Sequence, residues 1–94
     1  MKQERYTHNT IYYNKKVYAV GGRTYGDDEQ AILDTCECYD FDKNKWEWIA
    51  PMQSKRCTAF MFIYTNMIYV FGGYTGHLAR KTAIERYNKE TNRW

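Results

Sequence analysis

The side chains of this chain that could carry chemistry are two histidines, three cysteines and one short acidic run. A histidine that acts as a general acid or base needs a carboxylate or a nucleophile held beside it. His8 comes shortly after Arg5, and His77 lies in the segment after Gly73, so neither stands in a spacing typical of a catalytic set. We therefore predict no catalytic residue in this chain.

Two of the three cysteines, Cys36 and Cys38, are separated by a single residue. If this segment is a strand, both thiols point to the same face, because side chains alternate along a strand. Zinc sites usually combine two cysteines that have about two to four residues between them with a second ligand pair, and only Cys57 remains here. We predict that the thiols are buried apolar packing, with no metal and no cofactor.

The acidic residues at 27–29 form a loop tip that lacks the oxygen ligands of a calcium-binding loop. An odd number of cysteines argues against a disulfide framework and favours a reducing compartment. The predicted location is therefore the cytoplasm, with association with the cytoskeleton as an open alternative.

The composition describes a globular chain of 94 residues rich in aromatic side chains, which make up 18% of it. Aromatic and β-branched residues favour strands. The net charge is +3 and the basic residues are scattered, which argues against nucleic acid as a partner. The longest apolar stretches, 59–64 and 67–71, are too short to cross a bilayer, and residues 1–5 carry no apolar signal core. We expect no membrane partner.

Two Gly-Gly pairs, Gly21-Gly22 and Gly72-Gly73, stand 51 residues apart and mark an internal repeat. At this offset the aligned pairs are Arg5 with Arg56, Thr7 with Thr58, Tyr13 with Tyr64, and Tyr18 with Tyr69. After the glycines the offset is 48, and the aligned pairs are Glu37 with Glu85, Tyr39 with Tyr87, Asn44 with Asn92, and Trp46 with Trp94. A length change confined to one segment marks that segment as a loop.

Each repeat predicts the same series of short strands. In the first repeat we expect strands at 10–13 and 17–20, a third strand ending at Tyr39, and a fourth from Trp46 to Ile49. In the second repeat the expected strands are 59–64, 67–71 and one ending at Tyr87. Tight turns at 14–16 and 65–66 join the first two strands of each repeat. No segment sustains the 3.6-residue period of a helix.

This pattern resembles the kelch repeat, in which a double glycine follows an apolar strand and is followed by a tyrosine and then a tryptophan. The resemblance implies an all-β fold of β-propeller blades, each a four-stranded antiparallel sheet, with about two blades in this chain. The two units are 1–50, a complete blade, and 51–94, a blade without its outer strand.

The residues that carry the resemblance have structural roles. Glycine pairs allow positive φ or close packing, large aromatics fill the space between blades, and arginine ties loops together. These positions are Arg5, Gly21, Gly22, Tyr39, Trp46, Arg56, Gly72, Gly73, Tyr87 and Trp94.

Propellers bind their partners through loops. In kelch-like substrate adaptors of cullin ubiquitin ligases, the binding face carries residues just after each Gly-Gly and just after the repeat-opening arginine. By resemblance, the partner-binding candidates here are Arg23, Tyr25, Tyr74, Cys57, Thr58, Tyr6 and Thr7. Arg23 suits an acidic peptide, although it is equally consistent with pairing to a neighbouring loop.

The resemblance favours a non-catalytic protein-interaction scaffold that binds a protein partner through its loops. Three alternatives stay open: a substrate adaptor for a cullin ubiquitin ligase, a propeller enzyme whose active site lies on other blades, and a structural filler in a larger assembly. Propellers close with about four to eight blades, and fewer than about three repeats are rarely stable alone. We therefore expect neighbouring blades or subunits to complete the propeller, and the isolated chain to be oligomeric or insoluble.

Overall fold

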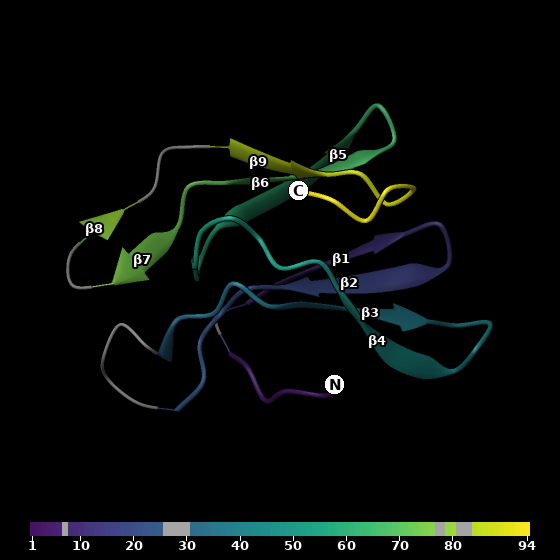
Figure 1. Cartoon of the computed structure of the whole chain (residues 1–94), viewed down its shortest axis with the longest axis horizontal. Coiled ribbons are helices and arrows are strands. Elements are labelled where there is room, and N and C mark those ends of the chain that lie inside the picture. Colours follow the sequence, from purple (N-terminus) through teal and green to yellow (C-terminus); the bar gives the residue numbers. More distant parts are fainter. Residues whose placement is uncertain (7, 26–30, 77–78, 81–83) are drawn as a thin grey trace.

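The computed structural model describes residues 1–6, 8–25, 31–76, 79–80 and 84–94, and within these ranges every regular element is a strand. One antiparallel sheet contains, in this order, β1 (Asn9–Tyr13), β2 (Lys16–Val20), β3 (Cys36–Asp40) and β4 (Lys45–Ile49). A second contains β5 (Phe60–Tyr64), β6 (Met67–Phe71) and β9 (Ile84–Tyr87). The two sheets lie one above the other (Figure 1). The predicted all-β class is confirmed, and in the described part of the chain no helix could span a membrane.

The hairpins at the start of each repeat form where the sequence predicts them. β1 pairs with β2 from Tyr13 opposite Lys16, which leaves Asn14 and Lys15 as the two turn residues, both with positive φ. Two-residue hairpin turns of this hand match the right-handed twist of the strands they join. The counterpart turn between β5 and β6 uses two residues that also have positive φ, Thr65 and Asn66.

The core lies between the two sheets, because each sheet buries one face against the other. The buried core side chains are Tyr18, Val20, Cys36 and Cys38 from the first repeat, and Met52, Ile68, Val70 and Tyr87 from the second. The rings of Tyr18 and Tyr87 meet across the interface, with centroids 6.2 Å apart. Burial of these apolar groups supplies most of the attraction between the sheets.

Two hydrogen bonds, one accepted by Asn92 and one donated by Trp94, hold the second repeat to the end of the first. Trp94 Nε1 donates to the carbonyl oxygen of Ala50 at 2.7 Å, and Ala50 N donates to Asn92 Oδ1 at 2.9 Å. The Tyr87 hydroxyl also donates to Asn92 Oδ1, at 2.7 Å, and so orients the amide. We call Tyr87, Asn92 and Trp94 the inter-repeat clamp.

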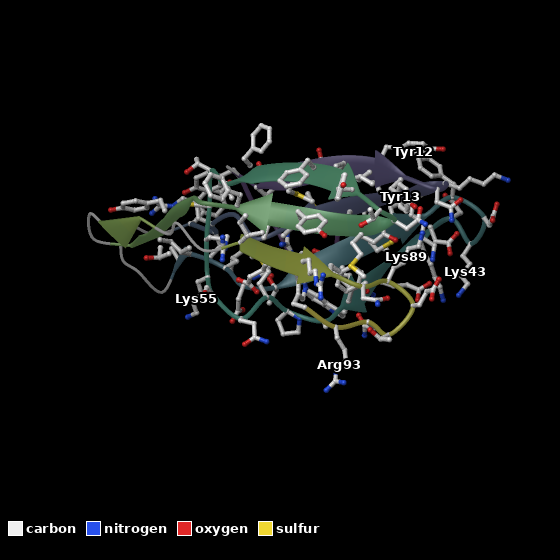
Figure 2. The ribbon with its side chains drawn as sticks, turned by 90° about the horizontal axis from the view of Figure 1, so that it is seen from above. Tyr12, Tyr13, Lys43, Lys55, Lys89 and Arg93 are labelled. Atoms are coloured by element: carbon white, nitrogen blue, oxygen red, sulfur yellow. The ribbon has the colours of Figure 1, made fainter. Side chains whose placement is uncertain are left out.

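At the hairpin end of the molecule, Tyr13 makes a second link between the repeats. Its hydroxyl donates to Asn66 Oδ1 at 2.7 Å, and Lys89 Nζ lies 4.0 Å from the centroid of its ring. Figure 2 shows Lys89 beside Tyr13 at this end of the sheets. A cation over an aromatic face is attracted by the electron-rich ring, so this contact adds to the apolar core.

The structure has two features that the sequence does not predict. The loop expected after Gly73 contains a short bulged hairpin, β7 (Tyr74–Gly76) with β8 (Ala79–Arg80), which is too short to show an alternating pattern. Ile84 aligns with the buried Cys36, but it is 55% exposed. Its side chain stands on the face of β9 that turns away from the first sheet.

Candidate partner-binding site

The loop end of the first repeat is built around Arg5, whose side chain is fully buried. Its Nη1 donates to the carbonyl oxygens of Gly21 (2.9 Å) and Thr35 (2.8 Å), and its Nη2 pairs with Glu37 Oε2 at 2.9 Å. The Glu37 carboxylate also accepts hydrogen bonds from Lys2 N and Gln3 N. A buried charge needs such pairing, and here the pairing fixes the segment that enters the repeat beside the end of β2.

Arg56 repeats this arrangement in the second sheet. Its Nη1 donates to Gly72 O at 3.0 Å and its Nη2 pairs with Glu85 Oε2 at 2.8 Å, while Gln53 N and Ser54 N donate to the same carboxylate. The main chain of Arg56 faces the first repeat: Gly22 N donates to Arg56 O, and Arg56 N donates to Leu33 O. Arg56 therefore joins the two repeats.

The glycine pairs let two loop segments approach closely. Gly22 has φ +95°, and a Cβ placed there would lie 2.6 Å from His8 Cβ and 2.9 Å from Tyr6 O. Gly73 has φ +96°, and a Cβ there would lie 2.9 Å from Cys57 O. Side chains are excluded at both positions by conformation and by space.

Because of this approach, the segment after each arginine hydrogen-bonds to the segment after each glycine pair. Tyr6 and Arg23 exchange two main-chain hydrogen bonds of 2.9 Å, and Cys57 and Tyr74 exchange bonds of 3.0 and 2.9 Å. The structure thus brings together the predicted partner-binding positions in two pairs, one in each repeat. The segments that follow Gly22 and Gly73 emerge at the same end of the molecule, opposite the hairpin turns (Figure 1).

Beside the first pair lies an open hollow of about 270 Å³, which we call the tyrosine hollow. It is lined by Met1, Glu4, Arg5, Tyr6, Thr24 and Tyr25. The rings of Tyr6 and Tyr25 lie 5.9 Å apart, and Tyr25 is 78% exposed. In the second repeat, Cys57 and Gly76 stand at the positions of Tyr6 and Tyr25, so no tyrosine pair forms there.

The remaining predicted residues do not line this hollow or lie outside the described part of the chain. Arg23 is half-buried and does not line the hollow, and Thr58 is exposed with φ +49° and donates its hydroxyl to Cys57 O. Thr7 lies outside the described residues, as do His77 and the acidic run at 27–29. Glu4 and Thr24 belong to the hollow although the sequence did not single them out; each directly adjoins a predicted position.

The protonation of His8 is governed by its surroundings. Burial and, to a smaller extent, the nearby Arg5 guanidinium lower the pKa of His8 below its ordinary value, which favours the neutral ring. Its Nδ1 is buried without a hydrogen-bond partner among the described residues. These residues also contain no group of three or more histidine, cysteine or carboxylate side chains that could hold a metal.

The three cysteines are free and buried, and we expect them to be inert in the folded chain. Burial raises the pKa of Cys36 to about 12 and also raises the pKa of Cys38. The thiolate is the reactive form, so at pH 8 only about one Cys36 in ten thousand is ionised.

Reaction with Ellman's reagent should be at least about a hundredfold slower in the native chain than in denaturant, where the three cysteines of the chain react. Rapid native labelling of Cys36 or Cys38 would contradict this burial.

Sheets built from tandem repeats, each packed on the next through its broad face, define the class as β-propeller blades. The kelch motif family model matches residues 4–53 and 55–94, and the chain belongs to the kelch-repeat family.

Three relatives illustrate this membership. Kelch-like protein 26 of Danio rerio is 33% identical over 95 residues, which cover all of this chain and 16% of that protein. Kelch-like protein 7 of Mus musculus is 32% identical over 94 residues, 100% of this chain and 15% of that protein. The influenza virus NS1A-binding protein homolog of Xenopus laevis is 41% identical over 64 residues, 68% of this chain and 9% of that protein. The chain thus spans about a sixth of the length of the first two relatives.

Proposed function

We propose that this chain supplies part of the protein-binding face of a kelch propeller and that the tyrosine hollow contacts the partner. The observation that carries the proposal is the position of Tyr6 and Tyr25, whose exposed rings stand over a main chain fixed by the buried Arg5. Tyrosine is enriched among the residues that dominate interface energies. A loop that is already ordered loses little conformational entropy on binding. One relative is named as the homolog of a protein that binds influenza virus NS1A.

The lining of the hollow favours an apolar side chain next to a basic one. Met1, Tyr6 and Tyr25 supply apolar surface, and Glu4 supplies a carboxylate. The guanidinium of Arg5 is already paired with Glu37 and buried, so its charge is not offered to a ligand. An acidic peptide recognised by Arg23 stays a prediction, because Arg23 lies outside the hollow.

The test is to select peptides against the chain from a random phage-displayed library and to measure their affinity for variants. Tyr25→Ala is expected to weaken the selected peptides by about tenfold or more, because it removes an exposed ring of the hollow. Tyr12→Ala, which truncates another exposed tyrosine of the first sheet (62% exposed, against 78% for Tyr25), is the control and should bind as the wild type does. Equal binding by the Tyr25 variant, or the absence of any enriched peptide, would count against the proposal.

A more specific function can be proposed from membership of the kelch-repeat family. We propose that the partner is a substrate presented to a cullin ubiquitin ligase in the cytoplasm, in keeping with kelch-like relatives and with three unpaired cysteines. If so, cells that carry Tyr25→Ala in the whole protein should accumulate the partner, while its transcript level stays unchanged. An unchanged level of a partner that no longer binds would favour a scaffold without ligase function.

A further inference from the structure

The outward face of the second sheet is a layer of large apolar side chains. They point the same way because they stand directly opposite one another across β5, β6 and β9. We call this layer the β6 face; its members are Phe60, Phe62, Tyr64, Tyr69, Phe71 and Ile84. The rings of Phe62 and Tyr69 stack at 5.1 Å with 2° between their planes. Phe60 and Tyr64 are 64% and 65% exposed.

The outward face of the first sheet is aromatic too. Tyr12, Tyr39 and Trp46 are brought to one side by the strand register, and Phe41 packs on the edge of Tyr39 at 4.9 Å. We call this layer the β3 face; its members are Tyr12, Tyr39, Phe41, Trp46 and Trp48. The Tyr39 hydroxyl donates to Asn44 Oδ1, as the Tyr87 hydroxyl does to Asn92 in the inter-repeat clamp. The β3 face therefore carries a second set of clamp residues.

The repeat relates these two faces to the interface that already exists inside the chain. Within the chain, the face that carries Tyr13, Tyr18 and Cys36 packs against the face that carries Tyr87 and Trp94. The β6 face is the second repeat's counterpart of the former, with Tyr64, Tyr69 and Ile84 at those positions. The β3 face is the first repeat's counterpart of the latter, with Tyr39 and Trp46. The two open faces thus share the three-stranded part of an interface that the chain forms once; among the described residues the second sheet has no counterpart of β4 or of Ala50, which takes part in the clamp hydrogen bonds.

Two side-chain exchanges indicate that the open faces fit each other. Inside the chain Lys89 lies over the ring of Tyr13; the counterparts are Phe41 on the β3 face and Tyr64 on the β6 face, which can form a ring–ring contact. Lys89 and Phe41 thus occupy equivalent positions in the two repeats, and their tyrosine partners, Tyr13 and Tyr64, are equivalent too.

The second exchange concerns Cys38, which lies close to Tyr87. Burial and, to a smaller extent, the nearby Cys38 thiol raise the pKa of the Tyr87 hydroxyl. The counterparts are Arg86, which stands beside Tyr69 on the outward side of the second sheet, and Tyr39 on the β3 face. An arginine guanidinium over a tyrosine ring is a favourable cation–π pair. In the proposed contact, the Arg86 charge beside the β6 face would therefore meet a suitable partner.

We propose that copies of this chain associate head to tail, with the β6 face of one copy packed on the β3 face of the next. The contact is heterologous, because the two surfaces differ, and such contacts build rings when the rotation closes. Closed propellers hold roughly four to eight blades, so a ring would contain roughly two to four copies of a two-blade chain. The proposal is independent of the function proposed for the tyrosine hollow.

The test uses one blocking variant on each face, Tyr64→Asp and Phe41→Asp, both at exposed positions where the fold should tolerate a charge. Analytical ultracentrifugation over a range of concentrations should show a wild-type mass that rises above one chain. Each variant alone should associate about tenfold or more weakly. Mixed together, the two variants should form a heterodimer, because the intact β6 face of Phe41→Asp meets the intact β3 face of Tyr64→Asp. The mixing experiment does not need soluble wild-type oligomers.

Phe41→Lys is the matched control, because it recreates the lysine–tyrosine contact seen inside the chain and should retain association. Circular dichroism checks that each variant is folded. Three results would overturn the proposal: a wild-type chain that stays monomeric at all concentrations, association that neither aspartate variant weakens, or a mixture that contains only single chains. If like faces paired instead, each variant alone would still form dimers through its intact face, and mixing would add no new species.

Discussion

Replacing Arg56 with methionine is expected to lower the free energy of unfolding by about 3–5 kcal/mol. The Arg56 side chain is 1% exposed, and its loss leaves the Glu85 carboxylate, itself 9% exposed, without a cation at 2.8 Å. Methionine has a similar length but cannot donate hydrogen bonds, so Gly72 O also loses its 3.0 Å donor. The free energy of unfolding of small domains is roughly 5–15 kcal/mol, so this single change removes a large part of it. Guanidinium titration followed by tryptophan fluorescence measures the effect.

The control for Arg56 is Lys43→Met, which breaks an ion pair on the surface. Lys43 and Glu47 lie 3.4 Å apart with side chains 60% and 42% exposed, and such pairs contribute about 0.5 kcal/mol or less. The double variant Arg56→Met with Glu85→Leu should recover part of the lost stability, because no buried charge remains. Similar losses from the Arg56 and Lys43 variants would show that burial does not set the cost.

Much of the fold follows from spacing in the sequence. The offset of 51 residues between the glycine pairs aligns β1 with β5 and β2 with β6. The turn residues Asn14 and Asn66 mark both hairpins, because asparagine tolerates positive φ better than most residues do. The kelch resemblance assigns the residues after Arg5 and those after Gly22 to one face, and in the structure Tyr6 and Arg23 exchange hydrogen bonds.

What the sequence could not predict depends on which face of each sheet is covered. Ile84 and Cys36 occupy the same place in their strands, yet the first is exposed and the second is buried, because only one of the two faces meets another sheet. The sequence also predicts only some of the residues that line the tyrosine hollow. Glu4 and Thr24 line it only because Tyr6 and Tyr25 come together from segments nineteen residues apart in the chain. Repeat spacing identifies equivalent positions but does not reveal their neighbours.

Replacing Gly21 with alanine is expected to be destabilising by about 2–4 kcal/mol, or to prevent folding. Gly21 has φ +64°, and a Cβ there would lie 2.4 Å from the carbonyl oxygen of Arg56 and 3.0 Å from Met52 Cε. The methionine tip can move, but the Arg56 carbonyl is held by a hydrogen bond from Gly22 N at 3.0 Å. The added methyl group must therefore push apart the two repeats at their junction. The midpoint of guanidinium unfolding provides the measurement.

A comparison of alanine with glycine at position 14, in the variants Asn14→Ala and Asn14→Gly, separates the effect of space from the effect of conformation. Asn14 has φ +54°, close to that of Gly21, but it stands in an exposed turn. Alanine at positive φ costs about 1–2 kcal/mol from conformation alone, so Asn14→Ala should be less stable than Asn14→Gly by this amount. If Gly21→Ala costs no more than this difference, the junction yields to the methyl group and close packing against Arg56 O is not the reason for glycine. A clearly larger loss at Gly21 would assign the difference to the contact between the repeats.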